Sequence, residues 1–158
     1  MSPKAEVEEW GTMEQDQLFK MIHTVEAVTN EAIIDWNTRF PHRLGISPIL
    51  TLGELSRKGL QNQMKLAETL GFTGGAMTNI AKKLISLGLV ERIYNEQDRR
   101  QVLLQITPAG TAVLTEAQAI GKQQYVELFD CLDETEIELY LSINEKLLHN
   151  IRSKRKKD

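Results

Sequence analysis

One predicted helix start combines small and polar side chains in a pattern that suits close contact with another molecule. Thr73 is expected to cap the helix, and Gly74 and Gly75 follow it on the first turn. Each glycine there costs about 1 kcal/mol relative to alanine, and a close approach of the backbone to a partner would explain that cost. Thr78 and Asn79 come next. An asparagine amide can pair with the edge of adenine, and a threonine can reach a base or a phosphate.

Two lysines further along the same helix, Lys82 and Lys83, suit contacts with phosphates. The residues expected to pack inward are Ala76, Ile80 and Leu84 at a spacing of four, with Met77 and Leu87 beside them. This leaves the glycines, Thr78, Asn79 and the lysines on the outside. The alternative is that these are solvated positions on an ordinary surface helix, but that alternative leaves the two glycines unexplained.

A charged hairpin is predicted directly after this helix. Residues 89–94 and 101–106 are rich in β-branched and apolar side chains, and a polar loop separates them. Asp98, Arg99 and Arg100 lie in that loop. An arginine at such a tip could enter the minor groove of DNA, where the negative potential is strong, and Asp98 could orient Arg100. The alternative is a charged tip that only keeps a strand edge soluble.

Two short helices are predicted before the glycine-containing one. Ser47-Pro48 is expected to begin the first, which runs to Lys58 with Ile49, Leu52 and Leu55 on its buried side and ends at Gly59. Asn62 is expected to cap a helix over 63–70 that closes at Gly71. The glycine-containing helix would then run over about 74–87 and close at Gly88. Two short helices joined by a turn with glycine are typical of a helix–turn–helix.

Long amphipathic helices are predicted at both ends of the chain. The first runs from about Thr12 to Phe40, where Pro41 ends it, and its apolar face is longer than a small domain can cover. That face contains Leu18, Ile22, Val25, Ala32, Ile33, Trp36 and Phe40. A helix from a second subunit would cover it.

A helix is expected to begin at Thr107-Pro108, and Asp133 with Glu136 predicts a capping box for the last helix. The run 154–157 is predicted to be a frayed basic tail. The apolar residues of these two helices are Val113, Leu114, Ala117, Ile120, Leu128, Phe129 and Leu132, then Ile137, Tyr140, Leu141, Leu147, Leu148 and Ile151.

The charge is unevenly distributed along the chain. The net charge of the 158 residues is −3, yet residues 57–107 carry eight Lys and Arg against four Asp and Glu. The segments on either side are acidic. Because a local field rather than the mean charge attracts a polyanion, the basic middle third is compatible with a nucleic-acid partner.

Several other classes of protein are not indicated. We expect no membrane span and no apolar signal segment, and therefore a cytoplasmic protein. A single cysteine, Cys131, allows no disulfide within the chain. Phosphate-binding glycine loops, HExxH and CxxC motifs and nucleophile–base pairs are all missing from the sequence, so we expect no enzyme, no catalytic residue and no cofactor. His23 and Glu26 lie one turn apart, but the other histidines are remote, so we expect no metal site.

The segments just described resemble the MarR family of winged helix–turn–helix transcriptional regulators. The similarity is carried by the runs KLAETLG at 65–71, GAMTN at 75–79, LGLVER at 87–92 and DRRQVLLQITPAG at 98–110. The order of helices agrees over nearly the whole chain. Lys65 departs from the family, which often has an acidic residue there that completes a capping box.

The resemblance implies a mostly α fold with a small β-wing, in which a winged helix–turn–helix is joined to a helical dimerisation region. Residues 1–45 and 108–152 would form the dimer, 46–107 would form the DNA-binding lobe, and 153–158 would be the basic tail. The resemblance also implies a homodimer on double-stranded DNA with a pseudo-palindromic operator, usually acting as a repressor. The wing arginine of the family falls on Arg100, and its orienting aspartate on Asp98.

The resemblance further implies release from DNA by a small aromatic or anionic effector. Trp36, Phe40, His42 and Arg43 are the candidate effector-binding residues, because an arginine beside aromatic rings can hold an anion. The alternative is that Trp36 and Phe40 pack in the core or in a dimer. Cys131 is interpreted as a buried, inert thiol rather than an oxidant sensor.

Two other functions stay open at this point. The chain could be a constitutive regulator, or one gated by oxidation of Cys131. It could also be a winged-helix module that binds protein, although exposed aromatics would then be expected on the glycine-containing helix.

Overall fold

The computed structural model describes residues 15–94, 98 and 101–155. It divides the chain into two compact units, Met1–Ala117 and Gln118–Asp158. The described elements are α1 (Gln15–Arg39), α2 (Ile46–Lys58), β1 (Gln61–Asn62), α3 (Gln63–Leu70), α4 (Gly74–Ser86), β2 (Val90–Tyr94), β3 (Val102–Ile106), α5 (Pro108–Phe129) and α6 (Glu134–Arg155). The prediction of a mostly α fold with a small β-wing is therefore confirmed.

A three-stranded antiparallel sheet of order β1-β3-β2 underlies the first unit. The register of β2 on β3 runs from Val90 opposite Ile106 to Tyr94 opposite Val102. The sequence analysis missed β1, which pairs Gln61 with Leu104 of β3. A two-residue strand has too few positions to show an alternating pattern.

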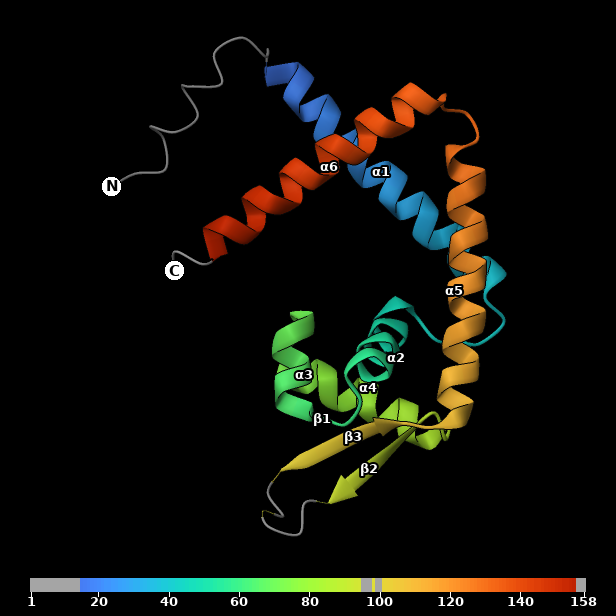
Figure 1. Cartoon of the computed structure of the whole chain (residues 1–158), viewed down its shortest axis with the longest axis vertical. Coiled ribbons are helices and arrows are strands. Elements are labelled where there is room, and N and C mark those ends of the chain that lie inside the picture. The colour runs from blue at the N-terminus through green and yellow to red at the C-terminus, as the bar shows by residue number, and fades with distance from the viewer. Residues whose placement is uncertain (1–14, 95–97, 99–100, 156–158) are drawn as a thin grey trace. The chain divides into compact units, whose positions relative to one another are not determined.

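The core of the first unit lies between the sheet and α2, α3 and α4, which gather beside the strands (Figure 1). Its largest fully buried side chains include Leu52, Leu55, Leu66, Met77, Leu84 and Leu104. These residues come from all three helices and from β3, so burial of their side chains joins the helix–turn–helix to the hairpin in one core.

Side-chain caps begin most of the described helices, as predicted. Asn62 Oδ1 accepts from the backbone nitrogens of Met64 and Lys65 at 2.9 and 3.3 Å. The α3 start is thus capped even though Lys65 departs from the family pattern. Thr73 Oγ1 accepts from the backbone nitrogen of Ala76 at 3.1 Å at the start of α4. The reciprocal bonds between Asp133 and Glu136 confirm the capping box of α6.

The start of α2 was predicted incorrectly. The helix begins at Ile46 after Gly45, which makes no side-chain cap, and Ser47 lies inside the first turn. The Ser47 carbonyl accepts from Thr51 Oγ1 at 2.9 Å. Pro48 is still tolerated because nitrogens in a first helical turn need no intrahelical acceptor. Gly59 ends α2 with a φ of 74°, as predicted.

The junction between β3 and α5 leaves no room for a side chain at Gly110. Thr107 donates from its backbone nitrogen to the Leu89 carbonyl and from Oγ1 to the Gly88 carbonyl, at 3.1 and 2.7 Å. Its Oγ1 also caps α5 by accepting from the backbone nitrogen of Gly110 at 3.1 Å. A Cβ on Gly110 would overlap the Leu89 carbonyl oxygen and lie 2.8 Å from Ile106 Cγ1. Only glycine fits this contact.

The first unit also contains α1, which ends at Arg39 before Pro41, as predicted. Trp36 and Phe40 at its C-terminal end are buried, whereas Ile22, Val25 and Ile33 of the predicted apolar face are exposed. The exposed apolar residues of α1 are Phe19, Met21, Ile22, Val25, Val28, Ile33 and Ile34. The apolar stripe thus continues well beyond the part that packs in the first unit.

The second unit contains the C-terminal part of α5 and the whole of α6. Three aromatic rings are in series there, with Phe129 5.8 Å from Tyr125 and 5.5 Å from Tyr140 between centroids. No residue of α6 is buried. Two predictions fail in this unit: Cys131 is exposed rather than buried, and Lys154 and Arg155 of the predicted frayed tail are helical residues of α6. Leu132 lies beyond the end of α5.

No helix among the described residues is long and apolar enough to cross a membrane.

Candidate nucleic-acid interface

The first turn of α4 presents backbone rather than side chains to its surroundings. Gly74 and Gly75 are exposed, and no described atom lies within 4 Å of the position that a Cβ would take at either residue. Neither glycine has a positive φ. Packing and backbone strain within the described chain therefore do not require glycine here. Glycines of this kind are expected on a surface that comes close to another molecule.

The buried face of α4 is rotated from the predicted one. Met77, Ala81 and Leu84 are fully buried, while Ala76 and Leu87 are exposed and Ile80 is half-buried. Met77, Ala81 and Leu84 fall at i, i+4 and i+7, which is also one helical face. The spacing alone admitted both stripes, and the longer Met77 side chain fills the core.

The rotation leaves Asn79 and Lys82 exposed on the side away from the core. The exposure of Asn79 is compatible with the predicted contact to a base edge, which stays a prediction. Lys83 is also exposed, but its Nζ donates to the Arg43 carbonyl at 2.7 Å. That contact joins the last turn of α4 to the loop after α1, so the Lys83 ammonium is used within the protein in this structure.

Thr78 is half-buried, and its hydroxyl is used within the protein. Thr78 Oγ1 donates to the Gly74 carbonyl at 2.9 Å and accepts from Gln63 Nε2 at 3.1 Å. Gln63 is the first residue of α3, so the contact joins the two helices of the helix–turn–helix. Sequence reasoning missed Gln63, because no pattern in the sequence pairs residues fifteen positions apart.

The hairpin of β2 and β3 follows α4, as predicted, and carries the loop with the three proposed groove-contacting residues. Asp98 is half-buried. Arg99 and Arg100 lie outside the described residues. Their proposed roles therefore rest on the strands that flank them, which pair up to Tyr94 opposite Val102.

A cluster on α2 was also missed. Glu54 is buried, and its Oε1 lies 2.6 Å from Lys58 Nζ and its Oε2 2.7 Å from Arg57 Nη2. Hydrogen bonds from Lys58 and Arg57 hold the pKa of Glu54 below its ordinary value. The spacing i, i+3 and i, i+4 could have revealed this cluster. It places two cations at the end of α2, just before β1.

The candidate effector residues come together only in part. Trp36 and Phe40 are stacked with ring centroids 4.5 Å apart, and His42 lies 5.0 Å from Phe40. His42 Nε2 lies 2.7 Å from Glu116 Oε2 of α5. Arg43 is exposed, and its carbonyl rather than its guanidinium makes the contact with Lys83. Burial of both aromatic rings favours the packing alternative for Trp36 and Phe40.

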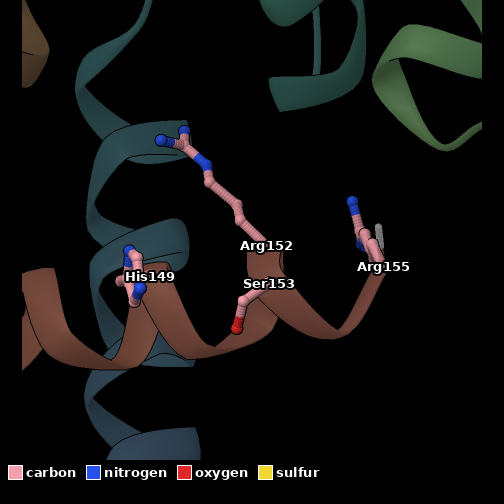
Figure 2. Close-up of a pocket in the computed structure, with 4 residues that line it drawn as sticks. All are labelled: His149, Arg152, Ser153 and Arg155. Carbon is pink, nitrogen blue, oxygen red and sulfur yellow. The ribbon is translucent and has the colours of Figure 1, made fainter. Parts of the chain in front are cut away.

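A second concentration of basic residues lies at the end of α6, in the second unit. His149, Arg152, Ser153 and Arg155 line a pocket along the last turns of this helix (Figure 2). Positive side chains at a helix C-terminus also interact favourably with the helix dipole, which is a sufficient local reason for them.

Comparison with known proteins agrees with this geometry. Residues 47–102 match the family model described as MarR family. The multiple antibiotic resistance protein MarR of Salmonella typhimurium is 30% identical over 91 residues, which cover 57% of this chain and 63% of that protein. The match therefore spans less than two thirds of that relative.

Two solved structures show the same fold. One is a mutant MarR from Escherichia coli complexed with operator DNA, with a TM-score of 0.72 and 22% identity over 87% of this chain and 99% of that one. The other is BpsR of Bordetella bronchiseptica, whose DNA binding is regulated by 6-hydroxynicotinic acid. Its TM-score is 0.70, with 18% identity over 81% of this chain and 98% of that one.

The family model covers α2 through the start of β3, which are the elements that form the helix–turn–helix and the hairpin described above. Members of this family are regulators of transcription rather than enzymes. Over residues 47–102 the chain is therefore similar to the MarR family, and its fold is that of the solved MarR structures.

Proposed function

We propose that the chain binds double-stranded DNA as a homodimer and regulates transcription, with the start of α4 in the major groove. The observation that carries the proposal is the exposed pair Gly74 and Gly75, beside the exposed Asn79 and Lys82. A helix whose first turns lack bulk can bring its backbone and an amide side chain to the base edges.

The charges around α4 support the same partner. Lys82 is exposed on α4, and Arg57 and Lys58 lie at the end of α2. Arg99 and Arg100 add two positive charges to the loop between the strands. Phosphate contacts of this kind position a protein on a duplex and make its binding depend strongly on salt.

A second copy of the chain is the proposed occupant of the apolar faces of α1 and α6. The exposed fractions are 61% for Val25, 58% for Ile34 and 60% for Leu139, and no residue of α6 is buried. Runs of exposed apolar side chains on two long helices mark an interaction surface rather than an ordinary monomer surface. Residues 1–45 and 108–152 are the proposed dimerisation segments.

The dimer is tested by the mass in solution. A chain of 18.0 kDa should sediment at about twice its mass. Leu141→Asp places a charge on the exposed apolar side of α6 and should shift the mass toward the monomer. Glu138→Asp, a change that keeps the charge on the same helix, should leave the dimer intact. A monomeric wild-type chain would contradict the dimer.

DNA binding is tested with duplexes selected from a random pool. We expect a pseudo-palindromic site, because a two-fold symmetric dimer contacts two related half-sites. Asn79→Ala should relax selection at one base position in each half-site, with a loss of about 1–3 kcal/mol. Arg100→Ala should weaken binding by a similar amount, whereas Arg152→Ala on α6 is the matched control. Failure to shift any duplex at low salt would refute the proposal and favour a protein partner.

Control by an effector is a further part of the proposal. Trp36 and Phe40 stack at the end of α1, and His42 beside them contacts α5, with its Nε2 2.7 Å from Glu116 Oε2. A small aromatic or anionic compound bound at this junction would alter how α1 and α5 meet and so release the DNA. Repression is the proposed outcome of binding, and the cytoplasm is the proposed location. Ligand screening by the thermal shift of wild type and His42→Ala tests the effector site.

Exposed Cys131 keeps redox control open as the alternative to an effector. Its Sγ donates only a weak bond to the Leu128 carbonyl at 3.6 Å. Release of bound duplex by peroxide from the wild type but not from Cys131→Ser would favour the redox alternative.

A further inference from the structure

The Thr78 hydroxyl has no proton to offer a nucleic acid. A hydroxyl carries one hydrogen and two lone pairs. Here the hydrogen is donated to the Gly74 carbonyl at 2.9 Å, and one lone pair accepts from Gln63 Nε2 at 3.1 Å. Phosphate oxygens, guanine O6 and N7, and thymine O4 all require a donor. The sequence-based suggestion that Thr78 contacts a phosphate therefore does not suit this geometry.

The surrounding structure holds the hydroxyl in this arrangement. Asn62 caps the helix that carries Gln63, and Thr73 caps the helix that carries Thr78. Gln63 Oε1 is buried and has no hydrogen-bond partner among the described residues. If the amide were turned over, Oε1 would accept the threonine proton in place of the Gly74 carbonyl. In both arrangements the proton stays inside the protein.

The Cγ2 methyl is the part of the Thr78 side chain with no hydrogen-bonding task. Thr78 is half-buried, so part of the residue remains accessible, and the exposed residues Gly75, Asn79 and Lys82 lie within four positions of it on α4. A threonine methyl makes an apolar contact with the C5 methyl of thymine in the major groove.

We infer that Thr78 is a specificity-determining residue that recognises the thymine C5 methyl through its own methyl group. This inference rests on the proposed DNA binding and adds one base preference to it. Gln63 contributes by keeping the hydroxyl engaged, which leaves the methyl as the group that reads the base.

The test replaces each thymine of the selected duplex in turn by deoxyuridine, which lacks only the C5 methyl. Wild-type protein should bind about fourfold more weakly at one position in each half-site, the effect of one methyl group removed from water. Thr78→Ser keeps the hydroxyl and loses the methyl, so it should bind thymine and deoxyuridine duplexes equally well. Thr78→Val keeps the methyl and should preserve the fourfold difference.

The two variants separate the methyl from the hydroxyl. An undiminished thymine preference in Thr78→Ser would overturn the inference, as would a loss of that preference in Thr78→Val with a normal circular dichroism spectrum. Wild-type binding that does not distinguish the two bases anywhere would overturn it as well and leave the proposed DNA binding standing. If no duplex binds at all, the proposed function fails first.

Discussion

Replacing Gly110 by alanine should destabilise the protein, because the new methyl group has no space at the junction of β3 and α5. The Cβ would overlap the Leu89 carbonyl oxygen and lie 2.8 Å from Ile106 Cγ1. To accommodate it, the first turn of α5 must move away from Leu89. That movement strains the hydrogen bond from the Thr107 backbone nitrogen to the Leu89 carbonyl, now 3.1 Å long.

The expected loss can be estimated from three contributions. Overpacking of a filled site costs about 1–3 kcal/mol. A weakened backbone hydrogen bond adds about 1 kcal/mol. In the opposite direction, alanine stabilises a helix by about 1 kcal/mol relative to glycine. The net decrease in the free energy of unfolding is therefore about 2 kcal/mol.

Urea denaturation followed by circular dichroism measures this loss. The proteins must be compared at equal concentration, because the stability of a dimer depends on it. Gly53→Ala is the matched control: it is the same change within a helix, and the nearest atom to its Cβ would be Leu114 Cδ1 at 4.0 Å. The control should be unchanged or slightly more stable. Equal stability of Gly110→Ala and Gly53→Ala would refute the steric argument.

Three other outcomes are expected. Gly75→Ala should fold normally and gain up to about 1 kcal/mol in helix stability, since its methyl meets no described atom of the protein. It should nevertheless bind the selected duplex more weakly, because the methyl would stand between α4 and the DNA. Gel-shift titration measures the affinity, and unchanged binding would count against close approach of α4. Glu54→Gln should lose about 1 kcal/mol or less at neutral pH. Because the folded pKa of Glu54 is lowered, its stabilisation is present above the ordinary glutamate pKa and disappears as the pH falls through the folded value; denaturation curves of both proteins should therefore converge in acid, and a constant difference would contradict the assignment. Gln63→Leu should change the free energy of unfolding by less than about 1 kcal/mol, because the lost bond to Thr78 is offset by removal of a buried oxygen without a partner; a large loss in thermal denaturation would show that this bond matters more to stability than we infer.

Local signals in the sequence predicted the elements that carry the interface. The caps at Asn62, Thr73 and Thr107 each form hydrogen bonds to backbone nitrogens near their own positions. Gly59 and Gly71 end their helices in the positive-φ conformation that glycine favours. These features depend on two to four neighbouring residues, so the sequence alone was sufficient.

Errors arose where a choice depended on distant residues. The spacing in α4 admitted both Ala76 and Met77 as the inward residue, and only the packing of α2, α3 and β3 selects Met77. Ser47 had the composition of a cap, but the chain enters α2 two residues earlier. Cys131 has apolar neighbours in the sequence, yet it lies exposed after the end of α5.

The sequence by itself determined that the chain has a capped helix–turn–helix, a charged hairpin and long apolar helices, because short-range hydrogen bonding and periodic burial encode such elements. Only the tertiary structure decided which groups at the interface are still available to a partner. It engages Thr78 with Gln63 and Lys83 with Arg43, and it leaves Asn79 exposed. Contacts between residues fifteen or forty positions apart form only when the helices pack, so no local pattern in the sequence predicts them.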